Sequence, residues 1–254
     1  MRLVDGAEAI RDDLPAAATV SVEVPLGAGN NEGTAVHRLS CLLSVRDAQL
    51  AALRDVTGTA VTIGGDCGVE LASVQHANST QDAMAVLWLD AHPDLNTPES
   101  SPSGAFTGMV LRTLLGDGTP SLVPPTPVDP SRTILAGIRN TDFGEGDYLA
   151  ASAVRLLEVQ QVSAESIGQS LAESGATSVY IHVDLDVLDP SEFDGVADPM
   201  PFGLTLAVLL EVITSAKATL PLAGAGIAGF APPSPEAAAD DLGTILRIIG
   251  ALSS

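Results

Sequence analysis

Five carboxylate and imidazole side chains fall into two groups with alternate spacing: Asp90, His92 and Asp94, and then Asp184 and Asp186. Each group ends an apolar run, 85–89 or 178–183, of the kind that forms a buried parallel strand. Alternate residues of a strand share a face, so the side chains within each group project together. Gathering this many carboxylates away from water is very costly unless cations neutralise them. The two groups therefore predict a site for a pair of divalent metal ions.

The elements that must position these groups follow an alternating pattern. Strand-like runs occur near 18–24, 59–63, 84–90, 133–137, 154–158, 178–184 and 222–230. Helical patterns separate most of them, over 34–56, 68–77, 165–174, 205–218 and 235–252, and residues 117–131 form a polar loop. This alternation predicts an α/β fold, a single-domain doubly wound parallel sheet flanked by helices, over residues 1–254. Ligands of such sheets bind outside the carboxyl ends of the strands, where both acidic groups fall.

The composition limits the possible partners. The chain carries 32 Asp and Glu residues against 11 Lys and Arg, for a formal net charge of −21. Phosphate backbones require clustered basic side chains, so a nucleic-acid partner is excluded and a small molecule is expected instead. No apolar run approaches the ~18 residues of a membrane span, and no secretory signal is apparent. We therefore expect a cytoplasmic protein with no membrane partner, in which Cys41 and Cys67 stay reduced.

Three motifs carry a resemblance to a known family. They are Gly64-Gly65-Asp66-Cys67-Gly68, Asp90-Ala91-His92-Pro93-Asp94 and Asp184-Leu185-Asp186-Val187-Leu188-Asp189-Pro190. In order and spacing they resemble the metal-binding motifs of the arginase/agmatinase (ureohydrolase) superfamily. The resemblance implies an arginase-like three-layer αβα fold and two Mn²⁺ ions, a metal that suits hard carboxylate ligands. By position, it assigns Asp90 and Asp184 to both ions, Asp94 to the first, and His92 and Asp186 to the second.

Cys67 departs from the family pattern, which has a histidine ligand to the first metal at this position. A thiolate can replace the imidazole, because a bound metal keeps the sulfur deprotonated. Thiolate is a softer ligand, so the site would select manganese less strictly and drift towards zinc. The alternative is a buried, inert cysteine and a lost ligand. We retain Cys67 among the expected metal ligands.

A polar segment after the second motif indicates the substrate. Asn96, Ser101 and Ser103 fall where arginases bind the substrate α-carboxylate, and Asp142 falls where they bind its α-amino group. The alternative is an ordinary loop rich in Ser, Thr and Pro. The resemblance therefore implies an α-amino-acid substrate and weighs against agmatine or guanidinobutyrate.

Two further departures bear on the reaction. Thr107 occupies the position of the histidine that transfers protons in arginases, and Gly229 replaces the carboxylate that faces the guanidinium. A positioned acid–base group accelerates a reaction by roughly 10²–10⁴-fold. Without it, arginine itself should be a poor substrate. A hydroxyguanidine is more easily neutral and needs no buried counter-charge. Together with Cys67, these departures resemble the Nω-hydroxy-L-arginine amidinohydrolases of D-cycloserine (antibiotic) biosynthesis.

The resemblance implies a hydrolase that cleaves Nω-hydroxy-L-arginine to L-ornithine and hydroxyurea, with Asp94 orienting the nucleophile and Thr107 near the substrate hydroxyl. An ordinary arginase or guanidino-acid hydrolase is the alternative enzyme. A metal-poor binding protein on an arginase scaffold is the alternative without catalysis.

His182 shares a strand face with Asp184 and is expected to be a structural histidine of the core. The alternatives are that it supports the metal ligands from behind or that it serves as a proton shuttle. The chain is expected to be a monomer.

Overall fold

A parallel six-stranded sheet forms the centre of this computed structural model, which describes residues 2–253. Its strands are β1 (Val61–Ile63), β2 (Met84–Leu89), β3 (Thr133–Ala136), β4 (Arg155–Leu157), β5 (Ser178–Asp184) and β6 (Leu222–Ala228), in the order β1-β6-β5-β2-β3-β4. The neighbours β2 and β5 are buried at every residue. Their largely apolar runs, in place of alternating ones, follow from burial on both faces.

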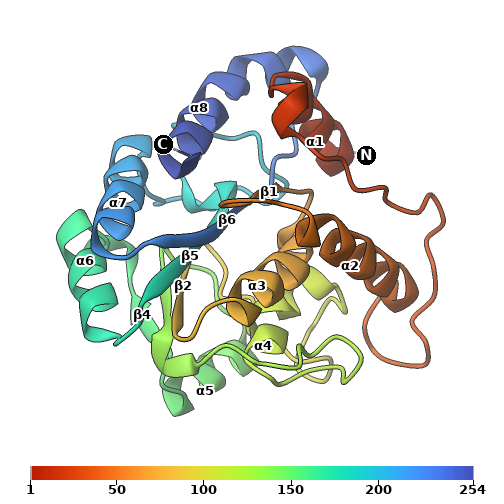
Figure 1. Cartoon of the computed structure of the whole chain (residues 1–254), viewed down its shortest axis with the longest axis horizontal. Helices are drawn as coiled ribbons and strands as arrows, with labels where there is room; N and C mark the ends of the chain where they lie inside the picture. Colours follow the sequence, from red (N-terminus) through yellow and green to blue (C-terminus); the bar gives the residue numbers. More distant parts are fainter. Residues whose placement is uncertain (1, 254) are drawn as a thin grey trace.

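Helices cover both faces of the sheet (Figure 1). One face packs against α1 (Arg2–Asp12), α6 (Ala164–Glu173), α7 (Leu206–Thr219) and α8 (Pro235–Ser253). The other packs against α2 (Leu39–Arg54), α3 (Glu70–Ser79), α4 (Val110–Leu114) and α5 (Phe143–Ala151). The three layers confirm the predicted α/β fold with a parallel sheet between helices.

The direction in which the chain builds the sheet reverses between β2 and β5. From β2 the chain moves outwards through β3 to the edge at β4, and from β5 it moves the other way to β6. Doubly wound sheets bind ligands at such a switch point, at the carboxyl ends of the strands. β2 ends at Leu89, directly before Asp90, and β5 ends at Asp184. The fold therefore places both acidic groups at the switch point.

The strand expected near 18–24 does not form, and that prediction is wrong. Residues 19–25 have no regular secondary structure, and the side chains of Val20 and Val24 are 68% and 61% exposed. β-Branched residues form a strand only where another strand pairs with them, and this segment crosses the surface between α1 and α2 (Figure 1). The sequence patterns also miss α1, α4 and α5. α4 and α5 are too short to show a helical period clearly.

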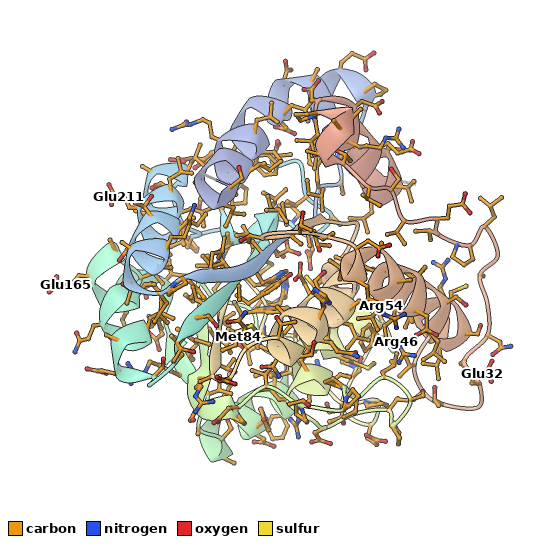
Figure 2. All side chains as sticks on the ribbon, viewed as in Figure 1. Glu32, Arg46, Arg54, Met84, Glu165 and Glu211 are labelled. Atoms are coloured by element: carbon orange, nitrogen blue, oxygen red, sulfur yellow. The ribbon has the colours of Figure 1, made fainter. Side chains whose placement is uncertain are left out.

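Part of the negative charge lies on the outer surface of the helices. Figure 2 shows Glu165 of α6 and Glu211 of α7 pointing away from the sheet, whereas Met84 lies inside at the start of β2. Such a surface solvates the protein and needs no binding partner. Among residues 2–253, no helix has the length and apolar character needed to cross a membrane.

Candidate metal centre

The carboxylates that follow β2 and β5 converge at the switch point. Asp186 joins the two strand ends, because its Oδ1 accepts a hydrogen bond from Ala91 N at 3.0 Å and its Oδ2 lies 3.0 Å from His92 Nδ1. Asp184 Oδ1 accepts from Asp186 N at 2.9 Å, and Asp90 Oδ1 accepts from His92 N at 2.7 Å. These local bonds to backbone N–H groups fix the orientation of the carboxylates.

Two sets of potential ligand atoms result, and within each set the atoms lie within 4.8 Å of one another. One set comprises Cys67, Asp90, Asp94 and His182, and the other comprises Asp90, His92 and Asp186. Asp184 adjoins the first set, because its Oδ2 lies 3.0 Å from Cys67 Sγ. The structure thus brings together every residue that the sequence assigns to the metals, with Asp90 common to both sets.

Asp94 provides a test of whether this cluster fits a cation. The side chain is buried, and its Oδ2 is an oxygen shielded from solvent without a hydrogen-bond partner. The residue also has a φ of 54°, in the left-handed region that residues other than glycine rarely adopt. An orphaned carboxylate oxygen on strained backbone, beside thiol, imidazole and further carboxylate donors, meets the needs of a divalent metal.

Cys67 reaches the cluster from a third strand. The turn after β1 leads into the 3-10 helix η2 (Cys67–Val69). The thiol is buried, with Sγ 3.0 Å from Asp184 Oδ2 and 3.8 Å from Asp90 Oδ2. Burial, followed by the charge of Asp94, raises the pKa of Cys67 well above its usual value. A bound cation would reverse this shift and favour the thiolate.

Burial also determines the protonation of the carboxylates. It raises the pKa of Asp94 and of Asp186 well above the usual value, and neighbouring carboxylates raise both further. Asp90 differs: burial opposes its ionised form, but the nearby imidazoles of His182 and His92 outweigh burial and lower its pKa. Burial likewise opposes the imidazolium of His92, but the carboxylates of Asp186 and Asp90 raise its pKa to about 11. The cluster without metal therefore holds protons at neutral pH.

Metal affinity should consequently rise with pH. The pKa values of Asp94, Asp186 and His92 are raised, so each group must lose a proton before it can act as a ligand, and metal binding releases these protons. We expect the Kd for Mn²⁺ to increase by about tenfold for each unit that the pH falls below 8, because His92, whose pKa is raised to about 11, must release one proton on binding. Chelator competition at pH 6, 7 and 8 measures this Kd. A Kd that does not change with pH would contradict the assignment.

Arg139 ties together the loops around the cluster. Its guanidinium donates hydrogen bonds to six backbone carbonyl oxygens: those of Gly137, Asp186, Val187, Leu188, Met200 and Pro201. These carbonyls belong to the segments that follow β3 and β5. Arg139 therefore holds in place the backbone that carries Asp186.

We expect Arg139→Met to destabilise the folded protein by about 2–4 kcal/mol, because several carbonyl groups lose a charged donor. Denaturation by guanidinium chloride measures the free energy of unfolding. Arg132→Met is the matched control. Arg132 is partly exposed, and its Nη1 lies 3.9 Å from Asp129 Oδ2, an ion pair at the surface. The control should change stability by less than about 0.5 kcal/mol. Equal effects of the two substitutions would show that Arg139 has no special role.

Two residues expected to bind the substrate lie in contact with each other. Asn96 donates from Nδ2 to Asp142 Oδ2 at 2.9 Å, and its Oδ1 accepts from Ser100 Oγ at 2.8 Å. Glu145 supports both residues, because its Oε1 accepts from Leu95 N at 2.9 Å and its Oε2 accepts from Asp142 N at 2.8 Å. An amide beside a carboxylate has the polarity needed to bind the two charged groups of an amino acid.

Ser101, Ser103 and Thr107 lie on the segment that follows Asn96. The hydroxyl oxygens of Ser101 and Ser103 are 3.5 Å apart and accept hydrogen bonds from nearby backbone N–H groups at 3.1 and 3.2 Å. They therefore shape the turn in which they lie. Thr107 is half-buried on the 3-10 helix η3 (Phe106–Met109), which packs against η2. The structure thus places the helix of Thr107 against the turn that carries the thiol.

Gly229 lies where a side chain does not fit. Its φ is 88°, and a Cβ atom built on it would lie 2.2 Å from Asp184 Oδ1. Its N–H donates to Gly65 O at 2.8 Å, which ties the end of β6 to the turn after β1. A carboxylate at position 229 is therefore incompatible with the position of Asp184 in this structure.

Glu145 and Asn140 contact predicted site residues, and the sequence patterns do not single out either one. Glu145 follows Asp142 with the D-x-x-E spacing of a capping box, and this signal could have identified it. Asn140 Nδ2 lies 3.1 Å from His92 Nε2. No local spacing points to the second contact, because it joins segments that are far apart in the chain.

The fold and the cluster define a parallel α/β protein with a candidate binuclear metal site at its switch point. The arginase-family sequence model matches residues 10–246, and the chain belongs to this family. It is 31% identical over 176 residues to the arginase of Bacillus caldovelox and 32% identical over 177 residues to that of Entamoeba histolytica. These alignments include 62% and 65% of this chain but 59% and 58% of the relatives. The chain thus spans less than two thirds of the length of these curated relatives.

Solved structures share the fold at lower sequence identity. The E. histolytica arginase, crystallised with L-ornithine, superposes with a TM-score of 0.88 at 22% identity, covering 99% of this chain and 92% of that chain. The proclavaminate amidino hydrolase of Streptomyces clavuligerus superposes with a TM-score of 0.65 at 22% identity, covering 83% and 70%. Both likenesses concern the fold alone.

Proposed function

We propose that this chain is a cytoplasmic two-manganese amidinohydrolase that cleaves Nω-hydroxy-L-arginine to L-ornithine and hydroxyurea, as in D-cycloserine biosynthesis. The observation that carries the proposal is the acidic cluster at the switch point, with two ligand sets that share Asp90. Membership of the arginase family supports hydrolysis of an amidino group. Relatives with this fold include arginases and a proclavaminate amidino hydrolase.

The available donors suffice for two cations. Cys67, Asp90, Asp94 and Asp184 would hold the first, and Asp90, His92, Asp184 and Asp186 the second. When bound, such a pair lowers the pKa of a shared water and supplies a nucleophile at neutral pH. Asp94 Oδ2, which has no hydrogen-bond partner within the protein, would accept a hydrogen bond from the attacking water and orient it.

The polar segment beyond the cluster would hold the amino-acid end of the substrate. Asn96 would donate to the α-carboxylate, with Ser101 and Ser103, while Asp142 would accept from the α-ammonium group. Glu145 fixes the backbone of Leu95 and Asp142 and so sets the distance between these groups. Binding at this segment would position the side chain of the substrate for attack.

The groups that this chain lacks favour a neutral guanidine derivative. Position 229 has no room for a carboxylate that would face a guanidinium, because the space belongs to Asp184. Position 107 is a threonine, whose hydroxyl is no acid at neutral pH but can bind the extra hydroxyl of hydroxyarginine. An uncharged hydroxyguanidine depends less than arginine does on a buried carboxylate at position 229 and on a proton-transferring histidine at position 107.

The test compares hydroxyurea released from Nω-hydroxy-L-arginine with urea released from L-arginine by the manganese-loaded protein. We expect kcat/KM to be at least about 100-fold higher for hydroxyarginine than for arginine. This is the smallest rate loss expected when one positioned acid–base group is missing. Comparable values would contradict this specificity and identify an ordinary arginase or guanidino-acid hydrolase. Elemental analysis after growth with manganese tests the other alternative, because less than a single metal ion per chain would favour a non-catalytic binding protein.

Asp142→Asn tests the proposed amino-acid head group. Removing the charge should raise KM about tenfold or more with a smaller change in kcat, because the contact is made equally in the ground and transition states. Asp147→Asn, an exposed change on the same helix, is the matched control and should leave both constants unchanged. Equal KM values for the two variants would contradict the role of Asp142.

A further inference from the structure

His182 is a fully buried imidazole on β5 that the proposed reaction does not use. It is 0% exposed, and neither Nδ1 nor Nε2 has a hydrogen-bond partner. Each nitrogen nevertheless faces a carboxylate, Nδ1 that of Glu70 at 3.3 Å and Nε2 that of Asp90 at 3.6 Å, and buried polar atoms without a well-formed hydrogen bond require an explanation. The Nε2 atom lies 3.6 Å from Asp90 Oδ2, longer than a normal hydrogen bond, and His182 belongs to the ligand set of Cys67, Asp90 and Asp94.

Glu70 lies on the other side of the ring. Its Oε1 is 3.3 Å from His182 Nδ1, and its Oε2 accepts a hydrogen bond from Tyr180 Oη at 2.6 Å. Glu70 is 0% exposed, a placement that a glutamate rarely takes unless it is paired, as it is here with Tyr180 and His182. A carboxylate that holds one ring nitrogen, while the other faces a cluster of donors, is the arrangement that orients metal-binding histidines.

The surrounding packing fixes this arrangement. The ring of Trp88, opposite His182 in the register of β2 and β5, stacks on the imidazole with centroids 3.7 Å apart and planes inclined by 29°. Trp88 Nε1 also donates to Asp90 Oδ2 at 3.2 Å. A Cβ atom built on Gly226 would lie 1.7 Å from Glu70 Oε1, so the glycine is what admits the carboxylate. Neither His182 nor Glu70 can therefore move far without disturbing the centre of the sheet.

We propose that His182 Nε2 is an additional ligand of the cation held by Cys67, Asp90 and Asp94, and that Glu70 is the residue that positions it. The inference rests on the proposed two-metal function and adds a ligand and a positioning residue to it. A site with one thiolate and one imidazole favours borderline cations such as Co²⁺ and Zn²⁺ more than a site of carboxylates does. The two metal positions should therefore differ in cation preference.

Co²⁺ titration of the protein freed of metal tests this ligand. A thiolate-to-Co²⁺ charge-transfer band in the near ultraviolet reports only the position that contains Cys67, and Cys67→Ser should abolish it. We expect His182→Asn to weaken Co²⁺ binding at this position by more than about 100-fold and Glu70→Gln by about tenfold, the range for outer-shell partners. His76→Asn, a half-buried histidine of α3, is the matched control and should leave the band unchanged.

Proton NMR of the Co²⁺-loaded protein provides a second test that does not depend on the folding of the His182 variant. Two exchangeable imidazole N–H signals, from His92 and His182, should show large paramagnetic shifts, and His92→Asn should leave one. Loss of every such signal in His92→Asn, or an unchanged Co²⁺ affinity in His182→Asn, would overturn the inference while leaving the two-metal function intact. Absence of Co²⁺ and Mn²⁺ binding by the unmodified protein would overturn both.

Discussion

Asp184→Ala should abolish binding of both metals. Asp184 Oδ2 lies 3.0 Å from Cys67 Sγ, and its Oδ1 accepts from Asp186 N, so the side chain touches members of both ligand sets. Outer-shell partners alone are worth roughly 10–100-fold in metal affinity, and a shared ligand should exceed this range. Elemental analysis and Mn²⁺ titration measure the loss, and hydrolysis should disappear with the metal.

The same substitution has two opposing effects on the stability of the protein without metal. It removes the acceptor of hydrogen bonds from Asp186 N and Cys67 Sγ, which destabilises the folded state. Burial, followed by the charge of Asp90, raises the pKa of Asp184, so the ionised carboxylate destabilises the folded state at pH 7, and its removal offsets part of that cost. Asp82→Ala, an exposed change two residues before β2 at the other end of the sheet, is the control and should retain both metals. Retention of both metals by Asp184→Ala would contradict its assignment to the centre.

Gly229→Ala should destabilise the protein by about 2–4 kcal/mol and greatly weaken metal binding. The added Cβ would lie 2.2 Å from Asp184 Oδ1 and 2.9 Å from its Cγ, so the carboxylate must move. Forced packing costs about 1–3 kcal/mol, and a left-handed φ of 88° adds about 1 kcal/mol for alanine. Denaturant unfolding of the protein without metal and Mn²⁺ titration measure the two effects.

A double-mutant cycle separates the clash from the backbone strain. In an Asp184→Ala background the carboxylate is gone, so Gly229→Ala should cost only about 1 kcal/mol, the strain of the left-handed backbone. Gly58→Ala is the matched control, because Gly58 has a φ of 99° and nothing within 4 Å of the added atom. A cost of Gly229→Ala that is the same in both backgrounds would show that Asp184 does not occupy the space beside Gly229.

Much of the fold can be predicted from local patterns. The runs 84–90 and 178–184 are correctly predicted as the buried strands β2 and β5, because burial on both faces selects a long apolar run. The strand predicted near 18–24 does not form. Its composition favours a strand, but no neighbouring strand pairs with it, and a local pattern carries no information about pairing.

The sequence by itself determined that Asp90, His92 and Asp94 follow one strand and that Asp184 and Asp186 follow another. The period of a strand and the rule that ligands bind at carboxyl ends are local consequences of backbone geometry. The resemblance of three motifs to those of the ureohydrolase superfamily added the prediction that Cys67 belongs with them. Within each acidic group, the inference concerns residues at most four positions apart in the chain.

Only the tertiary structure decided what surrounds those residues. It placed the imidazole of His182 on β5 between the carboxylates of Glu70 on α3 and Asp90, and it placed Asp184 in the space beside Gly229. The cause is packing: the sheet order and the crossing of α3 over it bring residues more than a hundred positions apart into contact, as Glu70 and Tyr180 show. A single sequence records the chemical groups, and the packed core decides which of them face one another.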